Sequence, residues 1–95
     1  MIGVLTHHWT NADQIQEGRD LLNRNGDAQS KAPGFVKRVT LYSLTDETKI
    51  TTLVTWNSNE IYDAWRASPE REAIMQDAPD LWSKATESER FEVSE

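Results

Sequence analysis

Two adjacent histidines near the start of the chain carry the side chains best suited to proton transfer. His7 and His8 are the only histidines in the sequence. Since the imidazole pKa is ordinarily about 6.5, a histidine in a pocket can take a phenolic proton and prepare an electron-rich ring for O₂. Neighbouring side chains of a strand point to opposite faces, so only one of the two can face a given pocket. The alternative for either residue is a hydrogen-bonded structural histidine near a dimer edge.

Aromatic and apolar side chains predict a site for a flat ligand. The chain has four tryptophans, and Trp65 is predicted to lie on the inner face of a helix, where it can stack on an aromatic ring. Its predicted apolar neighbours in that site are Trp56, Ile61, Ile74 and Met75. Tyr42 can donate a hydrogen bond to a phenol or quinone oxygen. Core packing explains the tryptophans equally well, and methionine is usually a gap-filler.

Charged and missing residue types narrow the chemistry further. Lys37 and Arg38 alternate faces on a predicted strand, and a cation beside the pocket can stabilise an enolate or phenolate. The simpler interpretation is that both are solvated. The chain has no cysteine, which excludes thiolate catalysis and cysteine-based metal sites. We see no metal-ligand spacing and no phosphate-binding glycine loop, and we expect neither a metal nor a cofactor.

The elements that must position these residues follow from hydrophobic periodicity. Four β-branched or alternating segments predict strands, over residues 2–9, 35–44, 49–56 and 89–95. A helix should start near Thr10, a possible cap, and end at Asn25-Gly26 or continue towards Ser30. Ser58 should cap a second helix, which restarts at Ser68-Pro69.

The order of these elements is β-α-β-β-α-β, which predicts an α+β, ferredoxin-like fold with a four-stranded antiparallel sheet. We expect residues 1–95 to form a single domain, because a chain of 95 residues supports one small core. With both helices on one face, the other sheet face stays uncovered. A two-fold homodimer would cover it.

Composition excludes several classes of partner. The net charge of −6 disfavours nucleic acid, which needs a clustered basic face. No segment approaches the length of a membrane span, and the start of the chain does not have the pattern of a signal peptide. We therefore expect a cytoplasmic protein with no membrane or nucleic-acid partner.

One segment resembles a known family. A strand ends in Trp56, Ser58 follows two residues later, Trp65 lies on the next helix, and Ser68 comes three residues after it. This pattern, with Pro-Gly-Phe at 33–35 before a strand, resembles the antibiotic biosynthesis monooxygenase family of dimeric α/β barrels. The resemblance implies a pocket between the sheet and the helices of each subunit.

The resemblance also implies a range of activities. Some family members oxidise aromatic polyphenols with O₂ and no cofactor, others are quinone monooxygenases, others degrade haem, and some have no known activity. The family's strand register implies that His7 faces the pocket. The haem-degrading branch has a histidine ten residues after its tryptophan, whereas Met75 stands ten residues after Trp65. Haem binding is therefore the least favoured alternative.

Two functional hypotheses remain. The first is a dimeric, cofactor-independent monooxygenase of an aromatic or quinol-type small molecule, in which His7 moves the proton and Trp65 lines the site. The second is a non-catalytic dimer that binds a small ligand on the same fold. A pocket of about 300 Å³ or more with His7 in its wall would favour the first hypothesis. A filled core with His7 bonded to the backbone would favour the second.

Overall fold

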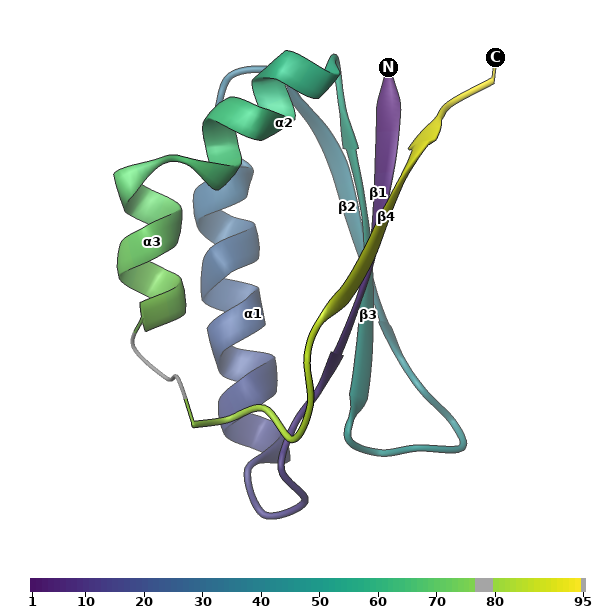
Figure 1. Ribbon diagram of the computed structural model, residues 1–95, viewed down its shortest axis with the longest axis vertical. Helices are drawn as coiled ribbons and strands as arrows, with labels where there is room; N and C mark the ends of the chain where they lie inside the picture. Colours follow the sequence, from purple (N-terminus) through teal and green to yellow (C-terminus); the bar gives the residue numbers. More distant parts are fainter. Residues whose placement is uncertain (77–79, 95) are drawn as a thin grey trace.

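The computed structural model describes residues 1–76 and 80–94. In chain order the elements are β1 (Ile2–Trp9), α1 (Ile15–Gln29), β2 (Phe35–Tyr42), β3 (Lys49–Trp56), α2 (Asn59–Arg66), α3 (Pro69–Gln76) and β4 (Glu87–Glu92). The four strands form one antiparallel sheet in the order β2-β3-β1-β4. The predicted α+β, ferredoxin-like fold is confirmed. The helices lie on one side of the sheet, whose other side is open (Figure 1).

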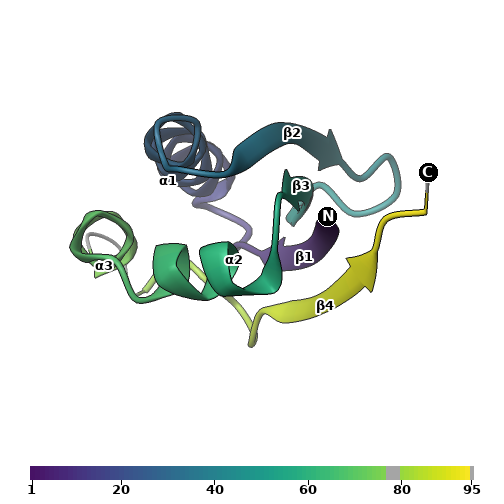
Figure 2. The same cartoon turned by 90° about the horizontal axis from the view of Figure 1, so that it is seen from above.

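Strand alternation divides the side chains of the sheet between two environments. On the helix side, Val4 is paired with Val54, and both pack with Trp56 and Trp65 in the main core cluster. Viewed from above, α2 lies beside β1 and β4, α1 lies near the β2 end of the sheet, and α3 lies farthest from the strands (Figure 2). The core therefore lies between β1, β3 and α2, where the tryptophans are.

The second and third helices each begin after a serine cap, and the second cap marks the break between them. The Ser58 hydroxyl accepts a hydrogen bond from the Ile61 backbone N–H at 3.2 Å. The Ser68 hydroxyl accepts one from Arg71 N–H at 3.3 Å, and Pro69 takes the first helical position after it. These bonds satisfy helix N–H groups that have no partner within the helix. The predicted restart at Ser68-Pro69 is confirmed.

The first helix differs from the expectation at its start. Its N-cap is Gln14, which makes no side-chain capping bond. Thr10 is instead fully buried and forms an isolated β-bridge with Trp82. A β-carbon on Gly18 would collide with the Thr10 side chain, so this glycine lets α1 approach the end of β1. At its other end α1 passes Gly26 and continues to Gln29, the longer of the two predicted alternatives.

The last strand and the open face complete the architecture. β4 begins two residues before the predicted segment and ends at Glu92; Glu95 of that segment lies outside the described residues. The sheet face away from the helices carries five large apolar side chains with exposed fractions between 36% and 50%, namely Val39, Leu41, Leu53, Phe91 and Val93. Within the described residues no helix is both long and apolar enough to cross a membrane.

Candidate functional site

Two hollows lie on the helix side of the sheet and share Trp65 as a wall. The first, which we call the inner cavity, has a volume of about 260 Å³ and lies between the sheet and the helices. The second, the outer groove, has a volume of about 460 Å³ and lies between the end of α1 and α2. The predicted pocket between sheet and helices is therefore present, as the inner cavity.

The inner cavity is strongly polar and basic for a space beside a protein core. Its lining includes the polar side chains His8, Asn25, Gln29, Arg38, Arg66 and Arg71. Among the described residues, no aspartate or glutamate lines it. Val4, Leu22 and Trp65 supply an apolar wall. A site with several cations and no acid favours an anionic group on its ligand.

Arg38 is fixed in the cavity by the first helix. From the half-buried strand position 38, its guanidinium donates to Gln29 Oε1 at 2.6 Å and to the Leu22 carbonyl at 2.9 Å. Burial lowers the pKa of Arg38 from its ordinary value, and the nearby Asp27 carboxylate opposes that shift. An arginine stays charged under such conditions, so β2 presents a held positive charge to the cavity.

His8 is a neutral imidazole buried near the end of β1. It is 8% exposed, and its ring lies 4.9 Å from that of Trp82. Burial, followed by the positive charges of Arg38 and Arg71, lowers the pKa of His8 from its ordinary value of 6.5 to about 4. At neutral pH His8 therefore carries no charge.

Two buried polar atoms of the cavity lining have no hydrogen-bond partner within the described residues. They are His8 Nδ1 and Asn25 Oδ1, and both residues are more than nine-tenths buried. A buried acceptor without a partner costs about 1–3 kcal/mol, so such atoms are rare unless a ligand or water bonds to them. A bound hydroxyl group would satisfy either one.

The prediction that His7 faces the pocket is wrong. β1 places Val4, Thr6 and His8 on the helix side, so His7 points to the open face. There its Nδ1 lies 2.8 Å from the Thr51 hydroxyl on the neighbouring strand. The family register was off by one residue, and a shift of one reverses the face of every side chain in a strand. The expectation that the two histidines point to opposite faces is confirmed.

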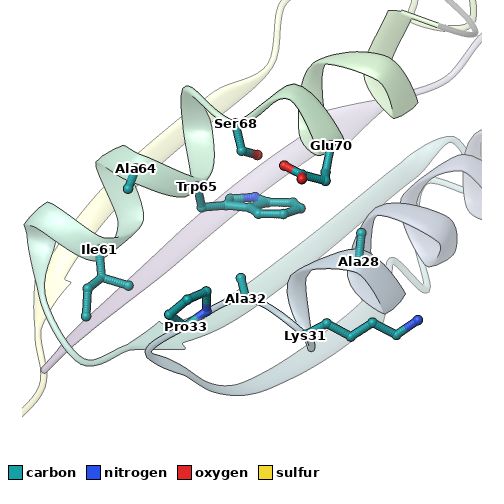
Figure 3. A pocket seen from close by; sticks show the side chains of 9 residues that line it. All are labelled: Ala28, Lys31, Ala32, Pro33, Ile61, Ala64, Trp65, Ser68 and Glu70. Carbon is teal, nitrogen blue, oxygen red and sulfur yellow. The ribbon is translucent and has the colours of Figure 1, made fainter.

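The outer groove is apolar in its interior and charged at its rim. Its apolar lining consists of Ala28, Ala32, Pro33, Ile61, Ala64 and Trp65. Figure 3 shows the Trp65 ring in the middle of this group, with Ile61 towards one end and Lys31 and Glu70 towards the other. Three alanines around one indole leave room that larger side chains would fill.

The structure brings together some of the other predicted site residues and separates the rest. Trp65 lines both hollows, Ile61 lines the groove and Met75 lines the inner cavity. Trp56 is fully buried behind Trp65, with ring centroids 6.2 Å apart, and lines neither hollow. Ile74 also lines neither. The prediction was wrong for both residues. Trp56 lies in the core behind Trp65, and α3 presents Met75 rather than Ile74 to the inner cavity.

Tyr42 is also outside both hollows. It lies at the end of β2, and the Arg19 guanidinium covers its ring at 4.0 Å from the centroid. This cation–π contact ties β2 to the start of α1. Tyr42 lies on the same face of β2 as Arg38, the helix side. It is four residues further along the strand, however, and therefore lies beyond the cavity that Arg38 lines.

Sequence reasoning passed over Asn25, Gln29, Arg66 and Arg71 as cavity residues. Arg38 was recognisable from strand alternation, because it lies opposite the core residue Val54. Asn25 and Gln29 are four residues apart on α1 and share its buried face, a spacing that marks one side of a helix. No sequence signal pointed to Arg71, since its position depends on how α3 packs.

The haem alternative does not fit this site. The inner cavity is smaller than the range of about 300–1,000 Å³ typical of sites for drug-sized ligands, and a haem is larger than such ligands. Met75 is in the wall, but the imidazole of His8 is held against Trp82.

The family model described as antibiotic biosynthesis monooxygenase matches residues 1–77. The chain belongs to the antibiotic biosynthesis monooxygenase family. The match runs from β1 to the end of α3, and so includes every element that lines the inner cavity except the segment around Thr86 and Ser88.

Solved structures share the fold of this family member at low sequence identity. SnoaB from Streptomyces nogalater, described as a cofactor-independent oxygenase, has a TM-score of 0.83 at 15% identity, with 99% of this chain and 94% of that one covered. Rv0793 from Mycobacterium tuberculosis has a TM-score of 0.88 at 14% identity, with 99% of this chain and 95% of that one covered. A conserved protein from Methanosarcina mazei Go1 has a TM-score of 0.86 at 19% identity, with 95% of this chain and 89% of that one covered. No curated protein sequence matches this chain.

Proposed function

We propose that this family member is a cofactor-independent monooxygenase of a small hydroxylated aromatic molecule. The observation that carries the proposal is the inner cavity, where three arginines and a neutral, buried histidine meet with no acid among the described lining residues. A phenol that enters as its anion matches this charge. The similarity to SnoaB, a cofactor-independent oxygenase, supports the same class of reaction.

The reaction is balanced without any added reductant. A phenol with a free ring carbon loses its hydroxyl proton and becomes an electron-rich phenolate. One atom of O₂ bonds to the ring carbon and ends as a carbonyl oxygen, while the ring hydrogen leaves as a proton. The second oxygen atom leaves as water, so the substrate itself supplies the four electrons and becomes a quinone.

The cavity residues divide the work between charge and hydrogen bonding. Arg38 and Arg71 stabilise the phenolate, because preorganised charges act strongly on developing charge. His8 Nδ1 accepts a hydrogen bond from a substrate hydroxyl, which orients the ring. Trp65 offers an aromatic surface, and Met75 adds an apolar wall. In this proposal His8, not His7, is the histidine that contacts the substrate, and it orients the ring without taking the proton.

The first experiment measures binding and ionisation together. 4-Nitrophenol changes its absorbance when it loses its proton, so its apparent pKa can be followed as protein is added. We expect saturable binding and a lower apparent pKa of the bound phenol. In Arg71→Gln the affinity should fall about tenfold or more and the pKa of the phenol should be lowered less, since a hydrogen bond to a charged group contributes about 1.5–3 kcal/mol. Arg90→Gln is the control, because Arg90 pairs on the surface with Asp63 at 2.7 Å. Equal binding by both variants would refute the charge argument.

The second experiment tests the chemistry. Oxygen uptake is measured with dihydroxynaphthalenes under ¹⁸O₂, in protein freed of metals by chelation. One labelled oxygen atom in the quinone product, with a rate that depends on Arg38 and His8, is the expected result. Uptake that chelation abolishes would contradict a cofactor-independent reaction.

A specific feature of His8 favours a second function, binding without turnover. With a pKa of about 4, His8 is a weak base at neutral pH and cannot hold a proton removed from a phenol. A ligand-binding protein on the same cavity would then show the 4-nitrophenol response but no oxygen uptake with any phenol of the panel. The two experiments together separate these functions.

We also propose that the functional unit is a homodimer joined through the open sheet face. Five large apolar side chains are exposed there, four on β2, β3 and β4 and the fifth, Val93, directly after β4. Soluble monomers rarely expose such a contiguous surface, and a second copy related by a two-fold axis would present the same apolar residues. The pairing would close the sheets into the dimeric α/β barrel expected from the family resemblance.

A further inference from the structure

The inner cavity is too small to hold more than the reacting part of a ligand. Sites for drug-sized molecules usually have volumes of about 300–1,000 Å³. The inner cavity, at about 260 Å³, falls below that range. A cavity of about 150 Å³ is enough for benzene, so this one accommodates a single hydroxylated ring. Any larger substrate must extend beyond it.

The outer groove is the available space on the other side of the same tryptophan. Trp65 is the one residue that lines both hollows among the described parts of the chain. The groove's volume of about 460 Å³ is within the range for small-molecule sites. Its interior is formed by apolar side chains, in contrast to the arginine-rich cavity. The two hollows thus offer opposite chemistry around one indole.

We propose that the outer groove and the inner cavity are two halves of one ligand site, and that the ligand is amphipathic. Its ionised, hydroxylated ring lies among the arginines of the cavity, and an uncharged alkyl or aryl extension lies in the groove against Trp65. This inference rests on the proposed function for the ring and adds the class of substrate: phenols with an apolar substituent of several carbons.

The surroundings of Trp65 support its place at the junction. One face of its indole stacks on Trp56, at an interplanar angle of 27°. Towards the groove the neighbours are small, with Ala28 from α1, Ala32 from the segment after it and Ala64 from α2 (Figure 3). An apolar extension laid over this surface would cover the ring without displacing a large side chain.

The charges at the rim limit what the extension can be. Lys31 and Glu70 have opposite signs and lie towards the same end of the groove (Figure 3). The groove therefore has no net charge to attract an ionised tail, and the buried part of the extension has to be apolar. The arginines of the inner cavity attract the ionised ring to the other half, which fixes the direction of the ligand.

The experiment compares 4-nitrophenol with its 2-butyl and 2-hexyl derivatives, using the absorbance change on binding to the full chain. Each methylene buried in the groove should tighten binding about fourfold, which corresponds to about 0.8 kcal/mol per methylene. Ala64→Phe fills the groove from an exposed helix position and should remove this gain while leaving the binding of 4-nitrophenol unchanged. Ala73→Phe, on the exposed surface of α3 and outside both hollows, is the matched control.

Each outcome decides between the two proposals. If 4-nitrophenol binds and the tails add nothing, the one-site inference is overturned while the proposed function stands. If no phenol binds, the proposed function fails and the inference fails with it. If tailed phenols bind in an Ala64-dependent way that Arg71→Gln does not affect, the groove is a separate apolar site and the one-site inference is overturned. Should Ala64→Phe not fold, Ala32→Leu reduces the groove from the α1 side.

Discussion

Gly26 of α1 lies so close to Arg38 of β2 that a β-carbon at residue 26 would stand 2.7 Å from Arg38 Nε. The Arg38 side chain passes this point to reach the Leu22 carbonyl and Gln29, its two hydrogen-bond acceptors on α1. A glycine inside a helix costs about 1 kcal/mol relative to alanine. The helix carries this cost where the arginine of the inner cavity needs the space.

The Gly26→Ala substitution should therefore weaken ligand binding more than it changes stability. Alanine favours the helix by about 1 kcal/mol, which offsets the two disturbed hydrogen bonds of Arg38 at about 1 kcal/mol each. We expect a free energy of unfolding within about 1 kcal/mol of the parent, and 4-nitrophenol binding about tenfold weaker, a difference of about 1.4 kcal/mol. Chemical denaturation and absorbance titration measure the two. In an Arg38→Gln background the same substitution should no longer affect binding.

Stability should fall on acidification because of His8. Its pKa is about 4 in the folded chain against 6.5 ordinarily, so between these values the unfolded chain binds more protons than the folded one. The His8 contribution is complete above about pH 6.5 and is lost progressively down to about pH 4, and its full size is about 3 kcal/mol. Urea unfolding at a series of pH values measures it.

The neighbouring histidine, His7, provides the control for the effect of acid on stability. His8→Gln should flatten the pH dependence in this window, because glutamine does not titrate. His7→Gln should leave the slope in place, since His7 lies on the open face beside Thr51. An equal loss of slope in both variants would contradict the assignment to His8.

The two histidines should also differ in catalysis. His8→Ala removes the hydrogen-bond acceptor of the inner cavity, and we expect oxygen uptake with dihydroxynaphthalenes to fall about tenfold, since one hydrogen bond contributes about 1 kcal/mol or slightly more. His7→Ala should retain the parent rate. A rate that depends on His7 alone would restore the assignment made from sequence.

The proposed dimer should dissociate when charge is placed on the open face. Leu53 is 36% exposed at the centre of that face, on β3. Leu53→Glu would bury an unpaired carboxylate on association, so the mass in solution, measured by light scattering, should fall from two chains to one. Ala73→Glu adds the same charge on α3, in the helix layer, and should leave the mass of two chains. A single-chain mass for the parent protein would refute the dimer.

The sequence by itself determined the order of the elements and the family. Strand alternation, the serine caps at Ser58 and Ser68, and Pro69 in the first position of α3 are local signals, because each depends on residues within one or two turns of chain. The same alternation correctly placed His7 and His8 on opposite faces. It also showed that a sheet face would remain without a cover.

Only the tertiary structure decided which histidine faces the cavity and which residues share it. Register between strands is set by the packing of the whole sheet, and an error of one residue exchanges His7 for His8. Arg38 from β2, Arg71 from α3 and Asn25 from α1 meet in one cavity through contacts between elements far apart in the chain. The hydrophobic pattern within one segment does not predict contacts between segments that are far apart in the chain. The same reason explains why Met75 lines the site and Ile74 does not.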